Sequence, residues 1–141
     1  VVVKSVNETV NNSTTLQNDD ALLLAILANE TWGFEFYLAV TSDGSRDFKA
    51  AITVPTAATL FWSYHPFVDA AAALAIAEAT TGSGTSKVFG FFNANIAGIL
   101  IKGKCVNGAN AGNIQLQWAQ DTAGAINTIV QQGTYAVFYK L

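Results

Sequence analysis

The side chains that most often do chemistry in proteins are few and far apart in this sequence. The chain contains one histidine, His65, and one cysteine, Cys105. His65 precedes a proline at the end of an alternating segment, whereas a general base also needs a carboxylate or a nucleophile within reach. A structural histidine in a turn is therefore the better interpretation. One histidine and one cysteine do not make a conventional zinc site, which takes four nitrogen or sulfur ligands, or three and a water.

Acidic residues occur in two short groups that bear on calcium binding. They are Asp19-Asp20 and, further along the chain, Asp43 with Asp47. Calcium takes six or more oxygen ligands, and neither group has the spacing of a known calcium loop. Solvated acids in turns are the better interpretation, and no metal or other cofactor is expected.

The remaining reactive candidates also have structural explanations. Cys105 shares the parity of Ile99 and Ile101 in an alternating segment, so a buried, inert thiol is expected. The triplet Gly82-Ser83-Gly84 is not followed by a Lys-Ser/Thr pair or by a helix, which favours a flexible turn over a phosphate-binding loop. The sequence shows no catalytic motif, and we expect that the protein is not an enzyme.

Composition limits the partners of this protein. The chain has 141 residues, of which 12% are charged and 51% hydrophobic, with a formal net charge of −3. Its seven Lys and Arg residues are scattered, whereas nucleic-acid binding needs clustered cations. The longest apolar run, Ala21 to Ala28, is too short to cross a bilayer. So few charges on a small domain predict that part of its surface is buried against partners, which are neither nucleic acid nor membrane.

The beginning of the chain has no pattern of an export signal. No charged region precedes an apolar core near Val1. The absence of methionine and the start at Val1 fit an initiator methionine removed before a small residue, so a complete gene product is expected. A single cysteine also means that folding does not depend on an intrachain disulfide.

The elements that must position these residues are β-strands. In the segment 29–54, large apolar residues occur at every second position on both sides of Asp43-Gly44. A period of two is typical of half-buried strands, and Asp-Gly is typical of a tight turn, so the segment predicts a β-hairpin. Aromatic residues on such strands can line a sugar-binding groove, but a place in the core is the better interpretation for Trp32, Phe34, Phe36, Trp62 and Trp118.

Further strands are expected along the rest of the chain, at 22–27, 60–64, 87–92, 96–106, 113–118, 126–130 and 134–141. The continuous apolar run 22–27 predicts a strand buried on both faces, and 113–118 predicts one with apolar residues inside and polar residues outside. The alanine-rich segment 68–79 fits a short helix or a strand equally well.

Together these segments predict an all-β fold. We expect residues 16–141 to form a single antiparallel β-sandwich domain, jelly-roll-like, with about eight strands. Residues 1–6 are rich in β-branched side chains, and 7–15 lack the pattern of a helix or a strand. Residues 1–15 therefore predict an extended N-terminal arm, ordered against a neighbouring subunit.

Two segments carry a resemblance to a known family. One runs from Lys4 to Asp20 and continues through Ala28-Asn29-Glu30-Thr31-Trp32 to Phe36. The other runs from Ile99 to Trp118 and includes Asn107-Gly108-Ala109-Asn110-Ala111-Gly112, with Gly133-Thr134-Tyr135 near the end. Together they resemble a family of small tailed-bacteriophage structural proteins, found alone or as modules of longer tail proteins. The match covers nearly the whole chain, although 55–86 departs from it, and its motifs are turns and strand faces.

The resemblance implies a virion component that forms a homotrimer, most simply a capsid decoration (cement) protein. Such a protein binds the major capsid protein on the outer surface of the particle, after assembly in the host cytoplasm, and stabilises the shell. The alternative is a tail-fibre or receptor-binding module that contacts host glycans, and a small enzyme fits least. The residues that we expect at interfaces are Val1, Val2, Val3, Val6, Val10, Phe61, Phe89 and Phe91.

Overall fold

The computed structural model describes residues 1–66, 78–80, 82–91 and 95–141, and all regular structure in them is β-strand. The strands are β1 (Val2–Val3), β2 (Glu8–Val10), β3 (Gln17–Ile26), β4 (Thr31–Thr41), β5 (Phe48–Thr53), β6 (Thr59–Pro66), β7 (Glu78–Thr80), β8 (Lys87–Phe89), β9 (Ile96–Val106), β10 (Gly112–Gln120), β11 (Thr128–Val130) and β12 (Tyr135–Lys140). These residues therefore include no helix that is long and apolar enough to cross a membrane. Most of the predicted segment 68–79 lies outside the described residues, and only its end, in β7, is seen as a strand.

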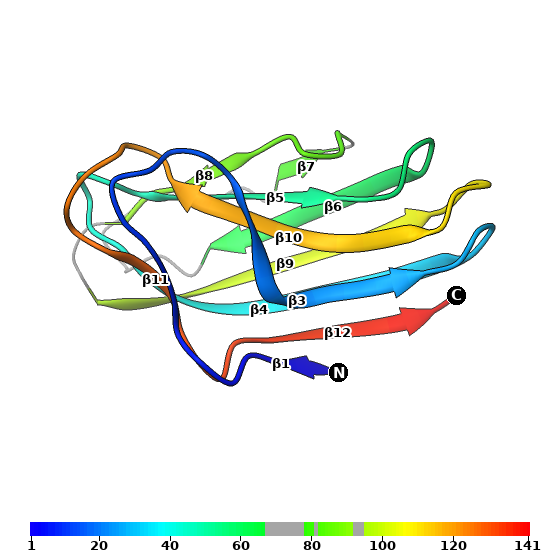
Figure 1. Ribbon diagram of the computed structural model, residues 1–141, viewed down its shortest axis with the longest axis horizontal. Helices are drawn as coiled ribbons and strands as arrows, with labels where there is room; N and C mark the ends of the chain where they lie inside the picture. The colour runs from blue at the N-terminus through cyan, green and yellow to red at the C-terminus, as the bar shows by residue number, and fades with distance from the viewer. Residues whose placement is uncertain (67–77, 81, 92–94) are drawn as a thin grey trace.

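The strands pair in a nested order: the first pairs with the last, the second with the second-last, and so on to the two middle strands. The pairs are β1–β12, β2–β11, β3–β10, β4–β9, β5–β8 and β6–β7, all antiparallel. A long hairpin rolled up in this way gives the two facing sheets of a jelly roll. The larger sheet has the order β1-β12-β4-β9-β6-β7, with β11 paired to β4 and β2 paired to β11, and the smaller has the order β3-β10-β5-β8 (Figure 1).

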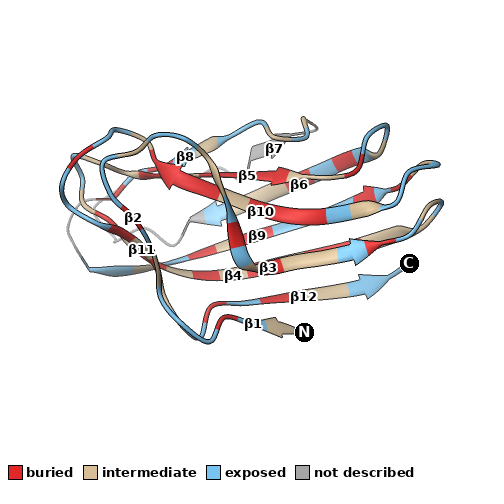
Figure 2. Cartoon of the chain, viewed as in Figure 1, coloured by how far each residue is buried: buried red, intermediate tan, exposed pale blue. Residues whose placement is uncertain are grey.

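The predicted fold class, an antiparallel β-sandwich, is thus confirmed. The strand count exceeds the expected eight because the short strands β1, β2 and β7 lie outside the segments that were predicted as strands. The apolar faces of the two sheets meet and form the core, visible as buried bands along the central strands (Figure 2). Of the five aromatic residues predicted there, Trp32 is half-buried against the core and the other four are fully inside it. Cys105 is buried as expected, and desolvation raises the pKa of its thiol.

The prediction of a hairpin at 29–54 is wrong. β4 and β5 lie in different sheets, and the chain between them crosses from one sheet to the other. Ser42 in this connection is buried, and its hydroxyl donates to the Asp47 carbonyl at 3.0 Å. A period of two identifies a strand with one buried face but does not specify its partner. Both strands turn their apolar faces to the same core from opposite sides, so the pattern is equally compatible with a hairpin and with a crossing.

β3 and β10 also differ from their predicted patterns. Of the run 22–27, only Leu22 and Ile26 are buried, because β3 is an edge strand of the smaller sheet. Gln115, predicted to be outside, is buried, and its Nε2 donates to the carbonyl of Asp19 at 2.9 Å. The register shifts here, because Asn18 pairs with Gln117 and Leu23 pairs with Gln115. The four residues 19–22 therefore face a single residue of β10, and this bulge turns Asp19 inward.

Residues 1–15 lie along the sandwich of their own chain. β1 pairs with β12 and β2 pairs with β11. The amide of Lys4 donates to the carbonyl of Thr134, and that of Gly133 donates to the carbonyl of Lys4, both at 2.8 Å. The N-terminal segment thus has β-partners within its own chain.

Candidate binding face and the buried Lys4 cluster

The side chains that point outward from four neighbouring strands of the larger sheet form one face. Residues directly opposite each other in an antiparallel pair point to the same side of the sheet. The register places Tyr135 opposite Tyr37, Glu35 opposite Lys102, and Lys104 opposite Phe61. We call this surface the outer face, and it comprises Glu35, Tyr37, Phe61, Lys102, Lys104, Tyr135 and Tyr139.

Specific cross-strand contacts order the centre of the outer face. The rings of Tyr37 and Tyr135 stack with their centroids 4.7 Å apart and an interplanar angle of 14°. The Tyr37 hydroxyl donates to the carboxylate of Glu35, which also lies 3.4 Å from the ammonium of Lys102. The hydrogen bond between Tyr37 and Glu35 raises the pKa of Tyr37 to about 12 and lowers the pKa of Glu35. The charges of Glu35 and Lys102 are therefore paired with each other at the centre of the outer face, which leaves the aromatic rings as the binding groups there.

Tyr139 gives the outer face a flat aromatic ring. The ring lies over Gly33, its opposite residue on β4, where a Cβ atom would come within 2.2 Å of Cε2 and 2.4 Å of Cζ. Glycine thus leaves room for the ring to lie on the sheet. Tyr139 is 44% exposed and Phe61 is 49% exposed, with Lys104 Nζ 5.7 Å from the centroid of the Phe61 ring. Exposed aromatic rings of this kind are typical of surfaces that bind other molecules.

The residues that we expected at interfaces fall into two groups. Val1, Val3, Val6 and Phe61 are exposed and Val2 is half-buried, as an interface requires. For Val10, Phe89 and Phe91 the expectation is wrong, because they are 4%, 2% and 7% exposed. Phe89 packs against Phe48 and Tyr64, with centroids 5.7 and 4.7 Å away, so it belongs to the core.

The sequence reasoning did not single out Tyr37, Tyr135 or Tyr139. These tyrosines occupy the outward parity of β4 and β12, where polar residues would be expected on a solvated sheet. The outward parity of these tyrosines can be read from the sequence. That they gather on one surface follows only from the order of the strands in the sheet.

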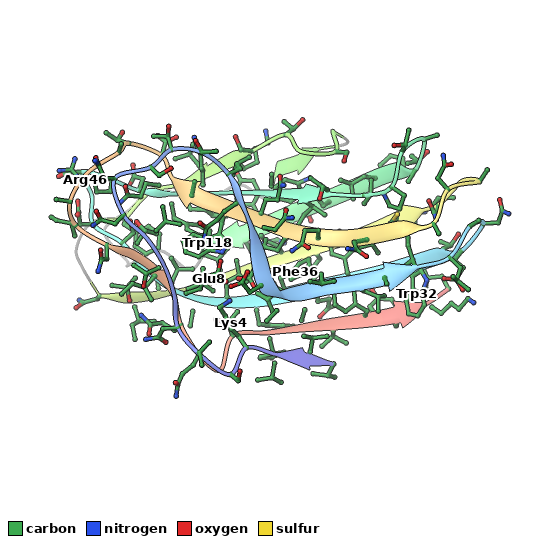
Figure 3. All side chains as sticks on the ribbon, in the orientation of Figure 1. Lys4, Glu8, Trp32, Phe36, Arg46 and Trp118 are labelled. Atoms are coloured by element: carbon green, nitrogen blue, oxygen red, sulfur yellow. The ribbon has the colours of Figure 1, made fainter. Side chains whose placement is uncertain are left out.

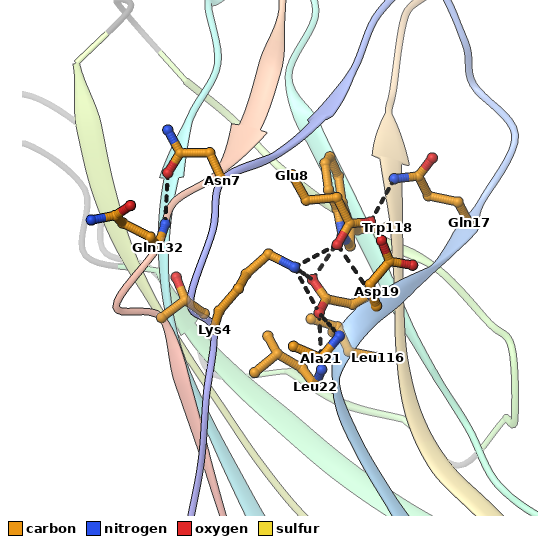
Figure 4. Close-up of polar contacts among 12 residues, drawn as sticks. Lys4, Asn7, Glu8, Gln17, Asp19, Ala21, Leu22, Leu116, Trp118 and Gln132 are labelled. Carbon is orange, nitrogen blue, oxygen red and sulfur yellow. Dashed lines mark hydrogen bonds and ion pairs between the residues drawn. The ribbon is translucent and has the colours of Figure 1, made fainter.

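A second polar cluster is buried between the N-terminal segment and β3 (Figure 4). Lys4 is 2% exposed and Asp19 is fully buried, so the prediction of a solvated turn acid is wrong for Asp19. The Lys4 ammonium lies 3.0 Å from both carboxylate oxygens of Asp19 and 2.5 Å from Oε2 of Glu8. Burial alone would lower the pKa of Lys4, but its bonds to Glu8 and Asp19 prevail and raise it. We call these three residues the Lys4 cluster.

The other residues with potential chemistry have local roles. His65 is exposed in β6. In the connection after β4, an Asp43 oxygen accepts from the Ser45 amide at 2.6 Å, and an Asp47 oxygen accepts from the Phe91 amide at 2.7 Å. Across the ranges that the structure describes, no group of three His, Cys, Asp or Glu residues is placed to hold a metal ion.

Glu30 anchors the end of the sandwich that carries Trp32 in Figure 3. Its carboxylate accepts from Lys140 at 2.6 Å, from the Trp32 indole at 3.0 Å and from the Leu27 amide at 2.9 Å. These hydrogen bonds lower the pKa of Glu30 to about 2, and the bond with Lys140 contributes most. Because the folded-state pKa lies below the ordinary value of 4.5, the stabilisation is complete above pH 4.5 and disappears as the pH falls through about 2.

We therefore expect Glu30→Gln to be less stable than the wild type at pH 6, with the difference vanishing near pH 2. Urea unfolding of both proteins between pH 2 and pH 6 measures the difference in stability. Asp20→Asn, at an exposed site, is the control and should show no such pH-dependent difference. An equal gap between Glu30→Gln and the wild type at pH 6 and pH 2 would contradict the assignment.

The chain matches no protein-family model, no curated protein and no solved structure.

Proposed function

We propose that this protein is a bacteriophage virion structural protein, a capsid decoration protein that binds the outer capsid surface as a homotrimer and stabilises the shell. The observation that carries the proposal is the outer face, where aromatic rings are exposed and the central charges are paired with each other. The part of the proposal that places the protein in a phage virion rests on the sequence resemblance. The proposed role is structural and not enzymatic.

Exposed apolar side chains support binding by contact area. Interfaces are enriched in Tyr and Phe and depleted in Lys, Glu and Asp, and this chain has only 12% charged residues. Among the residues whose burial the structure describes, the exposed large hydrophobic ones are Val1, Val3, Val6, Leu27, Phe61, Val88, Ile96, Val106, Ile126, Tyr135, Tyr139 and Leu141. Phe61, Tyr135 and Tyr139 belong to the outer face, and Ile96 and Val106 lie on the same outward side of β9. We propose this face as the principal contact surface.

Replacing Phe61 and Tyr139 together with serine is expected to weaken trimer formation and capsid binding tenfold or more, since central aromatic residues carry most interface energy (roughly 2 kcal/mol or more each). Size-exclusion chromatography with light scattering measures the trimer, and co-sedimentation with undecorated shells measures binding. Both side chains are nearly half exposed and lie outside the core, so the fold should persist. Val88→Ser, equally exposed but on β8 of the other sheet, is the matched control. Unchanged assembly and binding of the double variant would refute the proposal.

The copy number of the chain in purified particles tests its location. Quantitative mass spectrometry against the major capsid protein should give a number comparable with that protein. A handful of copies per particle would instead place the chain in the tail.

A receptor-binding module that contacts host glycans is the second candidate, and the flat ring of Tyr139 on Gly33 favours it. Sugar rings can pack on an exposed aromatic ring of this kind. A glycan array is the test, in which binding by the wild type that is lost in Tyr139→Ala would support this function over capsid decoration.

A further inference from the structure

The Lys4 cluster combines an amine and a carboxylate that are both withdrawn from water. The nitrogen of Lys4 lies 3.0 Å from each oxygen of Asp19, and neither side chain is more than 2% exposed. The apolar residues Leu22 and Leu116 are fully buried near them (Figure 4). Two reacting groups held together in a dry site have an effective concentration of about 10⁵–10⁸ M in favourable cases.

Both oxygens of Asp19 are held in distinct environments. Oδ1 accepts from two main-chain amides, those of Ala21 at 3.0 Å and Leu22 at 2.9 Å. Oδ2 accepts from the Trp118 indole at 3.2 Å. A pair of main-chain amides on one carboxyl oxygen is the arrangement that stabilises an oxyanion in acyl transfer.

Glu8 is placed to carry a proton between the two groups. Its Oε2 lies 2.5 Å from the Lys4 nitrogen, and its other oxygen is fixed by the side chain of Gln17 at 2.8 Å. The Asp20 amide, next to the reacting residue in the chain, also donates to Oε2 at 3.1 Å. Glu8 is 12% exposed, so it is the member of the cluster nearest to solvent.

We propose that the Lys4 cluster is an autocatalytic modification site, at which Lys4 Nζ and Asp19 Cγ join in an isopeptide bond. This inference does not depend on the proposed virion function.

The reaction is a condensation and needs no external reagent. Glu8 passes a proton from the Lys4 ammonium to Oδ2 of Asp19, and the neutral amine then attacks Cγ of the protonated carboxyl group, forming the N–C bond. Negative charge collects on Oδ1, between the amides of Ala21 and Leu22. The bond from Cγ to Oδ2 then breaks, and Oδ2 leaves as water with two protons that come from the Lys4 nitrogen, one of them through Glu8. An ammonium and a carboxylate thus become one amide and one water.

The product would tie the N-terminal segment to the smaller sheet. Lys4 follows β1 at the edge of the larger sheet, and Asp19 lies in β3 of the smaller sheet. The bond would close the chain between positions 4 and 19 and prevent β1 and β2 from separating from the sandwich.

Mass spectrometry of the full-length wild-type chain under denaturing conditions tests the proposal. The expected mass is lower than the calculated mass by one water. Trypsin should no longer cleave after Lys4, and fragmentation of the resulting peptide 1–46 should place the link between Lys4 and Asp19. A wild-type mass without the loss of water, after prolonged incubation of the folded protein, would overturn the proposal. A loss mapped to Asp43-Gly44, where a succinimide can form, or to a Lys4–Glu8 link would also overturn it.

Two variants separate the chemical roles. Lys4→Arg keeps the positive charge but cannot form the amide, and should have the full calculated mass. Glu8→Gln keeps the shape but removes the proton carrier, and should slow the reaction by about 10²–10⁴-fold. A Glu8→Gln protein that is folded by circular dichroism and links as fast as the wild type would exclude the role of Glu8.

Discussion

Replacing Asp19 with alanine is expected to lower the free energy of unfolding by about 3–5 kcal/mol. The substitution removes the partner of Lys4, which is 2% exposed, and so leaves a buried ammonium with Glu8 alone. It also leaves the Ala21 and Leu22 amides and the Trp118 indole without their acceptor. If the isopeptide bond is present in the wild type, the loss is larger, because the cross-link also restricts the unfolded chain.

Urea denaturation followed by tryptophan fluorescence measures this effect. Asp20→Ala is the matched control, since Asp20 is adjacent but exposed, and should change stability by no more than about 0.5 kcal/mol. The double variant Lys4→Met, Asp19→Leu should recover part of the loss, because it removes the buried ammonium together with its partner and leaves only the 12% exposed carboxylate of Glu8 without Lys4. Equal stability of Asp19→Ala and Asp20→Ala would contradict the role of Asp19 in anchoring the N-terminal segment.

Replacing Phe36 with alanine is expected to destabilise the fold by a similar amount, about 3–5 kcal/mol. Phe36 is fully buried on β4, and its ring contacts those of Phe34 and Phe138 at centroid distances of 5.5 and 5.7 Å. Because β4 pairs with β9, β11 and β12, a cavity at this position affects the centre of the larger sheet.

Thermal and chemical unfolding of Phe36→Ala measure the loss. Phe61→Ala is the control on the outer face, where the ring is 49% exposed and its removal should cost less than about 1 kcal/mol. If Phe61→Ala were as damaging as Phe36→Ala, the division into a buried inner face and an exposed outer face would be wrong.

The Lys4 cluster shows why part of the chemistry could not be read from the sequence. Lys4, Glu8 and Asp19 are ordinary charged residues in a polar segment, and Asp19-Asp20 has the appearance of a solvated turn. Only the bulge in β3 turns Asp19 inward, and only the pairing of β1 with β12 brings Lys4 to it. The same holds for the outer face, because Tyr37 and Tyr135 stack through a pairing between strands far apart in the chain.

The sequence by itself determined most of the long strands and, where apolar and polar residues alternate regularly, which of their faces is buried. It did not determine β1 and β2, nor the faces of β3 and the burial of Gln115. The alternation in β4, β5 and β9 is a local property, so the burial of Phe36, Ile52 and Cys105 followed from it. The strand partners were not determined, because the segment 29–54 satisfies its pattern equally as a hairpin or as a crossing between sheets. The tertiary structure decided that question, and with it the burial of Phe89 and Phe91, because pairing depends on contacts between distant segments that no local period encodes.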